Sequence, residues 1–419
     1  MDSGRGAGDR SAGVLRDVFQ SRVFVALALG IIALGDIALC ALFGRTPHAW
    51  FAVTTVLVIC LGFGFIHLRH AALALATALA PLPGLIAAVS LAHGAALETL
   101  ALAYLAGLTI ALFLADEIAL RVVEGSGVAD ATAGTLQDTG IAACAAIIAA
   151  SAFTALLFFA GLFARVPAIG ALAEFAAGAS ALIVLPLVAS LLPFGEDFVA
   201  RANRLRELRE RRIEKIVAVT EPRWGWSLTG IGIVFLAPAF FGSRSLHLTA
   251  SAAHSALEIL LAAAVVAVGA ALVATRDWRR SLAVAIVLGL VALIGCWGYA
   301  RGGVTLDIAT WLLLMQALGV GVASILLVAN AARPDVGEDT TAASVRSLLG
   351  KTSAAVTSSI CAVVVLLVFS FGIGGEAIAL AVAIFFAGVG AVLLQPALTI
   401  AIETLVPRRS TIEARYRVN

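Results

Sequence analysis

Apolar stretches of about twenty residues recur along the whole chain, and they limit the possible folds more than any other feature of the sequence. A helix needs about 20 consecutive apolar residues to cross the hydrocarbon core of a bilayer. Lipid offers no hydrogen-bond partner to an exposed backbone, so segments of this length cross it as helices. The sequence therefore predicts an all-α polytopic membrane protein.

The composition excludes a water-soluble enzyme. Hydrophobic residues make up 61% of the chain and charged residues 13%, and the mean hydropathy is +1.05, whereas soluble domains carry about 25% charged residues. The net charge of +2 gives no indication of a nucleic-acid partner. Membrane lipids are the partners that the composition implies.

Twelve transmembrane helices are expected, six in each half of the chain. The predicted spans are 23–43, 51–68, 72–92, 97–116, 141–163, 169–192, 227–241, 253–274, 281–298, 306–330, 353–371 and 376–400. With these spans only Arg45, Arg165, Arg244 and Arg301 face outward, which leaves 24 of the 28 basic residues on the inner side. Basic loops stay in the cytoplasm, so both termini are predicted to be cytoplasmic and the protein to be a multi-pass protein of the cell inner membrane.

An internal repeat relates the two halves. GLTIA at Gly107–Ala111 matches GVGVA at Gly319–Ala323 at an offset of 212, and Thr139 pairs with Thr352 at an offset of 213. Because each half contains an even number of helices, both halves begin on the same side of the membrane. The repeats are therefore predicted to be parallel, with the functional region at their interface.

This organisation gives five expected segments. The segment at 194–224 is rich in charge and carries apolar residues at helical spacing, as expected of an amphipathic helix along the cytoplasmic interface. The segments are an N-terminal cytoplasmic part (1–22), a first six-helix repeat (23–193), an amphipathic linker helix (194–224), a second six-helix repeat (225–400) and a cytoplasmic C-terminal tail (401–419).

Several stretches resemble the transmembrane core of the resistance-nodulation-division (RND) superfamily, including its MmpL-like exporters. They are GLTIALFLADEIALRVVEGSG from Gly107, AEFAAGASALIVLP from Ala173, GVGVASILLVANAARPDVGED from Gly319 and AVLLQP from Ala391. The resemblance covers nearly all of the membrane-embedded chain. The large extracytoplasmic porter domains of that family are missing, because the corresponding connections are only 44–50 and 242–251.

The resemblance implies a transporter that moves or binds a hydrophobic or lipid-like substrate between the repeats. The acids that relay protons in that family are replaced here by Ala111 and Ala323, which cannot titrate. The alternative is therefore a non-transporting scaffold or accessory subunit that has lost proton coupling and acts with a protein partner or as a homo-oligomer. A membrane-embedded enzyme acting on lipids is a third possibility, weakened by the lack of clustered catalytic residues.

Ionisable residues inside membrane helices are candidates for function because their burial is costly. Asp36, Glu174 and Glu258 are the candidate substrate or proton residues. Glu174 and Glu258 lie near the expected outer surface, where solvation by water is the alternative interpretation. Asp116 and Glu117 fall at the cytoplasmic end of their helix and are expected to be solvated.

Three prolines are expected to kink or locally unwind their helices: Pro81, Pro83 and Pro238. The sequence contains no phosphate-binding loop, dinucleotide fingerprint or catalytic motif, and its Cys and His residues show no metal-ligand spacing. We therefore expect no enzymatic activity, no cofactor and no metal site.

Overall fold

The structure is a computed structural model and describes residues 59, 70–91, 97–159, 166–195, 198–200, 211, 224–249, 253–304, 308–331, 351, 354–366 and 375–405. This part of the chain is helical and contains no strands. Eight of its helices are long and apolar enough to cross a membrane, and two shorter apolar helices accompany them. The predicted span 23–43, with Asp36, and all of the span 51–68 except residue 59 lie outside the described residues. Most of the linker 194–224 and most of the tail 401–419 lie outside them as well.

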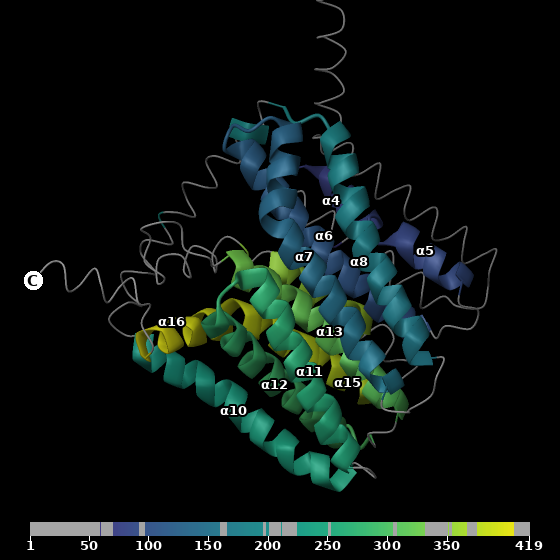
Figure 1. Ribbon diagram of the computed structural model, residues 1–419, viewed down its shortest axis with the longest axis vertical. Helices are drawn as coiled ribbons and strands as arrows, with labels where there is room; N and C mark the ends of the chain where they lie inside the picture. Colours follow the sequence, from purple (N-terminus) through teal and green to yellow (C-terminus); the bar gives the residue numbers. More distant parts are fainter. Residues whose placement is uncertain are drawn as a thin grey trace, which may run out of the picture.

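The helices of the first half lie in the upper part of Figure 1. They are α4 (Ala71–Leu79), α5 (Leu82–Leu91), α6 (Leu97–Val123), α7 (Val128–Phe159) and α8 (Val166–Leu191). The chain turns at Ala80 and Pro81 between α4 and α5. The expected proline break is thus present there, because the Pro81 ring and its missing N–H interrupt the helical hydrogen bonds.

The helices of the second half lie in the lower part of Figure 1. They are α10 (Trp224–Thr249), α11 (Ala253–Thr275), α12 (Trp278–Arg301), α13 (Ile308–Ala331), an unlabelled helix (Ala354–Leu366), α15 (Gly375–Val389), the π-helix η3 (Gly390–Leu394) and α16 (Gln395–Leu405). Helix α10 continues through Pro238, so the local unwinding expected at that proline is not found. The π-helix instead ends at Leu394, two residues before Pro396, whose ring disturbs the preceding turn.

Helices α6 and α13 form the centre of the bundle. Every residue in the apolar window of α13 is buried, as are 83% of those in α6, compared with 33% in α11. Helix α13 packs against α6 and α7 of the first half and against α15 of the second. A helix that is apolar on all sides is expected at such a fully enclosed position.

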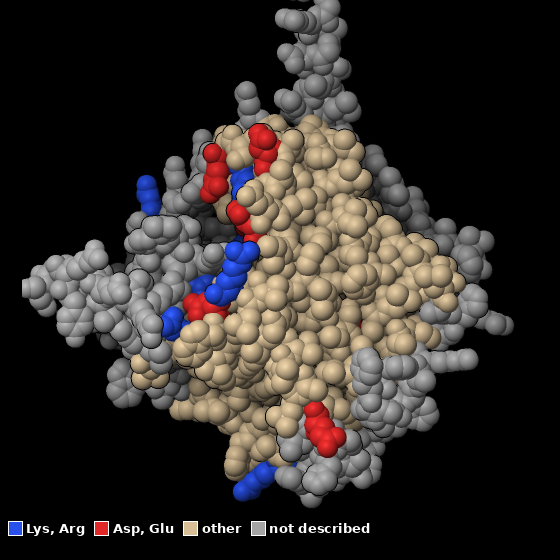
Figure 2. Space-filling view, in the orientation of Figure 1, with Lys and Arg blue, Asp and Glu red and all other residues tan. Residues whose placement is uncertain are grey.

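The outer helices present apolar side chains to their surroundings. Examples are Ile183 and Leu187 on α8, Val265 on α11, and Phe240 on α10, which are all more than half exposed. In Figure 2 the charged residues of the visible face lie along its left margin and near its lower tip, and an uncharged surface separates them. This distribution fits a multi-pass membrane protein whose middle zone faces lipid.

Small residues allow some helices to approach very closely. A Cβ atom added at Gly84 on α5 would lie 1.9 Å from the carbonyl oxygen of Ala176 on α8, and one at Gly242 on α10 would lie 1.8 Å from that of Leu293 on α12. Glycine is therefore required at both crossings. Without a hydrophobic force between helices in lipid, such close contacts supply much of the packing energy.

Candidate functional site

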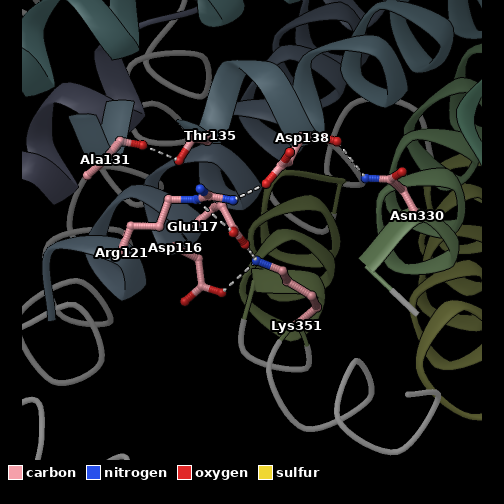
Figure 3. Close-up of polar contacts among 8 residues, drawn as sticks. All are labelled: Asp116, Glu117, Arg121, Ala131, Thr135, Asp138, Asn330 and Lys351. Atoms are coloured by element: carbon pink, nitrogen blue, oxygen red, sulfur yellow. Dashed lines mark hydrogen bonds and ion pairs between the residues drawn. The ribbon is translucent and has the colours of Figure 1, made fainter. Parts of the chain in front are cut away.

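Two groups of polar residues join the first half of the chain to the second. The first, which we call the ion network, consists of Asp116, Glu117, Arg121, Asp138 and Lys351 (Figure 3). It lies at the C-terminal end of α6 and in the first part of α7, with Lys351 reaching it from the second half.

Glu117 is the bridging member of the ion network. Its Oε2 accepts a hydrogen bond from Lys351 Nζ, and its Oε1 accepts one from Arg121 Nε at 3.2 Å. Lys351 Nζ also lies 3.6 Å from Oδ2 of Asp116. Arg121 in turn donates to Asp138. The two cations therefore hold carboxylates of α6 and α7 together and fix them to a segment more than two hundred residues away.

The strength of these ion pairs differs with their exposure. The Lys351 and Glu117 side chains are only 10% and 16% exposed, whereas that of Asp138 is 62% exposed. Exposed pairs contribute little because water screens them. Burial of the Lys351 ammonium group lowers its pKa, but the carboxylates of Glu117 and Asp116 outweigh that effect, so the pKa of Lys351 lies above its ordinary value. Of the two cations in the ion network, Lys351 is thus the one that stabilises the contact between the halves.

A neutral hydrogen bond accompanies the ion network. Asn330 near the end of α13 donates through Nδ2 to the backbone carbonyl of Asp138 on α7 at 3.2 Å. Further along the same interface, the hydroxyls of Thr109 on α6 and Ser358 on the helix Ala354–Leu366 share a hydrogen bond. The contact between the halves therefore contains both ion pairs and hydrogen bonds between neutral groups.

The second group, which we call the buried acid site, consists of Glu174, Thr154, Gln316 and Thr99. Glu174 on α8 is 1% exposed, and its Oε2 accepts a hydrogen bond from the Thr154 hydroxyl on α7 at 2.6 Å. Gln316 on α13 is fully buried and donates through Nε2 to the Thr99 carbonyl on α6 at 3.3 Å. Four helices from both halves thus contribute to one polar cluster.

Two glycines bring these side chains together. A Cβ added at Gly170, one turn before Glu174, would lie 3.0 Å from Thr154 Cγ2 and 3.1 Å from Gln316 Nε2. A Cβ added at Gly319, on α13, would lie 3.0 Å from Glu174 Oε1. The carboxyl group therefore faces the backbone of α13 directly.

Two oxygen atoms of the buried acid site lack a hydrogen-bond partner among the described residues. They are Oε1 of Glu174 and Oε1 of Gln316. Buried polar atoms are nearly always hydrogen-bonded, and an exception calls for an explanation such as an unseen ligand or a functional role. A buried carboxylate without a counter-ion is the more costly of the two.

The structure revises several expectations about the acidic residues. Solvation at the outer surface does not apply to Glu174, because its side chain is 1% exposed and lies against α7 and α13. Glu258, by contrast, is exposed. Asp116 and Glu117 were expected to be solvated, and this was wrong: Asp116 is 8% exposed and Glu117 is paired with Lys351. Asp36, the remaining candidate, is not described.

The two positions that the RND resemblance assigns to a proton relay are occupied by alanine here. Ala111 on α6 and Ala323 on α13 are both fully buried in the centre of the bundle. Gln316 comes seven residues before Ala323, which corresponds to about 10 Å along the helix axis. The buried acid site is therefore displaced by about two turns from the relay positions, and the sequence analysis overlooked Gln316 because a neutral amide carries no charge signal.

An apolar groove of about 400 Å³ lies between the helix Ala354–Leu366 and α15 with η3. Val356 and Phe385 lie on opposite sides of it and are both partly exposed. Ser359 also lines the groove, but its hydroxyl donates to the carbonyl of Ala355 in its own helix. The groove can therefore accept an apolar chain and offers little to a polar ligand.

The fold is that of a helical multi-pass membrane protein. It is similar to the crystal structure of SecDF from Thermus thermophilus, a translocon-associated membrane protein, with a TM-score of 0.59 and 15% identity over 85% of this chain and 62% of that one. It is also similar to SecDF in its super-membrane-facing form, with a TM-score of 0.55 and 16% identity over 88% of this chain and 64% of that one.

The chain spans somewhat less than two thirds of the length of these SecDF structures. No family model and no curated protein matches the sequence. At this level of identity the likeness concerns the fold alone. The resemblance to the RND superfamily and to its MmpL-like branch stays a prediction.

Proposed function

We propose that this protein moves or binds a hydrophobic or lipid-like substrate between two parallel six-helix repeats in the inner membrane. The observation that carries the proposal is the apolar groove between the helix Ala354–Leu366 and α15. Both helices belong to the second half, and the first of them borders the first half through the contact of Ser358 with Thr109 on α6. Its volume of about 400 Å³ falls within the range of roughly 300–1,000 Å³ typical of ligand pockets. The proposal requires neither an enzymatic step nor a cofactor.

The contacts between the halves support the repeat on which this proposal rests. At the offset of 213 that pairs Thr139 with Thr352, Asp138 is equivalent to Lys351. Asp138 receives a hydrogen bond from the end of α13, and Lys351 binds the end of α6. The two positions that the predicted repeat pairs thus each contact a helix of the other half, which supports the repeat.

The groove is suited to an acyl or isoprenoid chain because its walls are apolar and lie among lipid-facing side chains. Val356 and Phe385 are 40% and 51% exposed, so a chain is able to enter from the bilayer without crossing a polar layer. Burial of such a chain against protein replaces lipid contacts with closer packing, so the affinity depends on the shape of the groove rather than on the hydrophobic effect.

Native mass spectrometry with lipid extraction tests the proposal. The full-length protein is purified gently from its own membrane as wild type, as Ile360→Trp, which fills the groove, and as Ile183→Trp on α8. Ile183 is a matched control because it is an exposed isoleucine on a membrane helix away from the groove.

A chemically distinct lipid bound in stoichiometric amount to wild type and to Ile183→Trp, but lost from Ile360→Trp, supports the proposal. Binding of bulk phospholipid alone, or equal retention by all three proteins, refutes it. The identity of the retained lipid also names the class of cargo.

The accessory subunit remains the second candidate, and two observations favour it. Ala111 and Ala323 remove the titratable groups from the family relay positions, and the similar SecDF structure is described as translocon-associated. In this case a partner protein co-purifies in fixed stoichiometry with both tryptophan variants. Asp36→Asn separates the candidates further: loss of function with preserved assembly favours transport, and a silent variant favours the scaffold.

A further inference from the structure

We propose that Glu174 is a proton-binding residue and that its protonation controls how α13 packs against α7 and α8. The proposal goes beyond the proposed function because it does not depend on the cargo, and its test uses a separate measurement. The residues involved are those of the buried acid site, at positions other than Ala111 and Ala323.

The first step of the argument is the enclosure of the Glu174 carboxyl group. It is 1% exposed, Thr154 supplies its hydrogen bond to Oε2, and its Oε1 has no partner among the described residues. No ion pair joins it to a cation in this part of the chain. A carboxyl group in such surroundings is stable as the neutral acid, because a charge there is neither solvated nor compensated.

The neighbouring helices add little charge to this environment. On α6, the titratable residues nearest in sequence to Thr99 are Glu98 and Tyr104. The Tyr104 hydroxyl donates a hydrogen bond to the Ala78 carbonyl. Helices α4 and α5 carry no charged residue. The charged residues of α7, Asp130 and Asp138, lie at the far end of that helix from Thr154, and α13 contributes the neutral Gln316.

The second step is the contact with α13. Gly319 brings the backbone of α13 so close that an added Cβ would lie 3.0 Å from Glu174 Oε1 and 3.2 Å from the Ala150 side chain. The backbone of α13 therefore closes this side of Oε1. Loss of the proton therefore requires α13 to move away from α7 and α8 and admit water, because the charge is otherwise unsolvated.

The third step is the depth of the site. Glu174 and Gln316 each lie eight residues after the start of their helices, which corresponds to about 12 Å. The site is therefore inside the membrane span, and water reaches it only after the helices around it separate locally. Proton uptake and release are thus linked to a change in the contact between the halves.

Hydrogen–deuterium exchange of the full-length protein in lipid nanodiscs tests this link. Exchange of peptides from α13 is measured as a function of pH and corrected for the intrinsic exchange rate. Wild type is compared with Glu174→Gln, which mimics the neutral acid, and with Glu258→Gln, a control at an exposed glutamate on α11. Infrared spectroscopy of the same samples records the C=O band of protonated carboxyl groups.

In wild type and Glu258→Gln, exchange in α13 is expected to rise with pH in a single transition, together with loss of an acid C=O band. Both changes are absent in Glu174→Gln. A flat profile in wild type, or a transition that persists in Glu174→Gln, overturns the proposal.

Thr154→Val provides a second test if Glu174→Gln does not fold. The Thr154 hydroxyl stabilises the charged form of Glu174, so its removal is expected to move the transition upward by about one pH unit. A transition at the wild-type pH overturns the assignment to Glu174. Loss of lipid binding in either variant is measured separately and bears only on the proposed function.

Discussion

Replacement of Lys351 by methionine tests whether the ion network holds the two halves together. The substitution keeps an apolar side chain of similar length and removes the ammonium group that contacts Glu117 and Asp116. Both carboxylates then lose a buried cation, while Glu117 keeps its hydrogen bond from Arg121. We expect Lys351→Met to fold and to be less stable than wild type.

The burial of the pair sets the size of the effect. Removing one partner of a fully buried pair costs about 3–5 kcal/mol, and an exposed pair contributes about 0–1 kcal/mol. With Lys351 and Glu117 at 10% and 16% side-chain exposure, the pair lies nearer the buried limit, and Arg121 compensates part of the loss. We therefore expect a destabilisation of about 2–3 kcal/mol.

A double-mutant cycle of Lys351→Met, Glu117→Gln and the combination isolates the interaction. Unfolding in mixed detergent micelles gives the free energy of each protein, and the coupling energy is expected to be about 1.5–2 kcal/mol. A coupling energy below about 0.5 kcal/mol would show that the contact contributes no more than an exposed pair, and would refute the reasoning from burial.

The same pair predicts how stability depends on pH. Because the folded pKa of Lys351 is raised above its ordinary value of 10.5, its contribution is complete below that pH and is lost as the pH rises through the folded value. Wild type is expected to lose stability in this alkaline range. Lys351→Met is expected to lack this component, and an identical alkaline profile in the two proteins would contradict the assignment.

Two further predictions concern packing in the first half. The buried His70 ring accepts a hydrogen bond from the Leu73 N–H at the start of α4, and burial lowers the pKa of the ring. The stability of the protein is therefore expected to fall as the pH drops below about 6.5. Thermal unfolding of His70→Gln as a function of pH should lack this fall. Gly84→Ala places a Cβ 1.9 Å from the Ala176 carbonyl oxygen and should destabilise the fold by about 1–3 kcal/mol. Gly232→Ala is the control, since its Cβ meets no atom within 4 Å, and equal melting temperatures for the two glycine variants would disprove the close approach.

Hydropathy and turn chemistry are local properties, and what depends on them was predictable from the sequence. The apolar stretches predicted a helical membrane protein, and Pro81 predicted the break between α4 and α5. The motifs at Gly107 and Gly319 predicted an RND-like fold, and the structure resembles SecDF in its fold. The number of twelve helices and the position of the termini stay predictions.

The partners of the polar residues were decided only by the tertiary structure. Lys351 and Glu117 are 234 residues apart, and no local pattern indicates that they meet. A signal was available in the repeat, because the offset that pairs Thr139 with Thr352 also aligns Asp138 with Lys351. That alignment predicts equivalent positions, but it does not indicate which residues of the other half each one contacts.

The sequence by itself determined that Glu174 lies within a membrane helix, and it left open whether the side chain faces water, lipid or protein. Helix α8 is apolar on every side, so its pattern shows no preferred face. The packing of α8 against α7, and the approach of Gly319 on α13, place the carboxyl group in a dry enclosure. Burial depends on neighbours brought from distant parts of the chain, and for this reason only the assembled bundle distinguishes the enclosed Glu174 from the exposed Glu258.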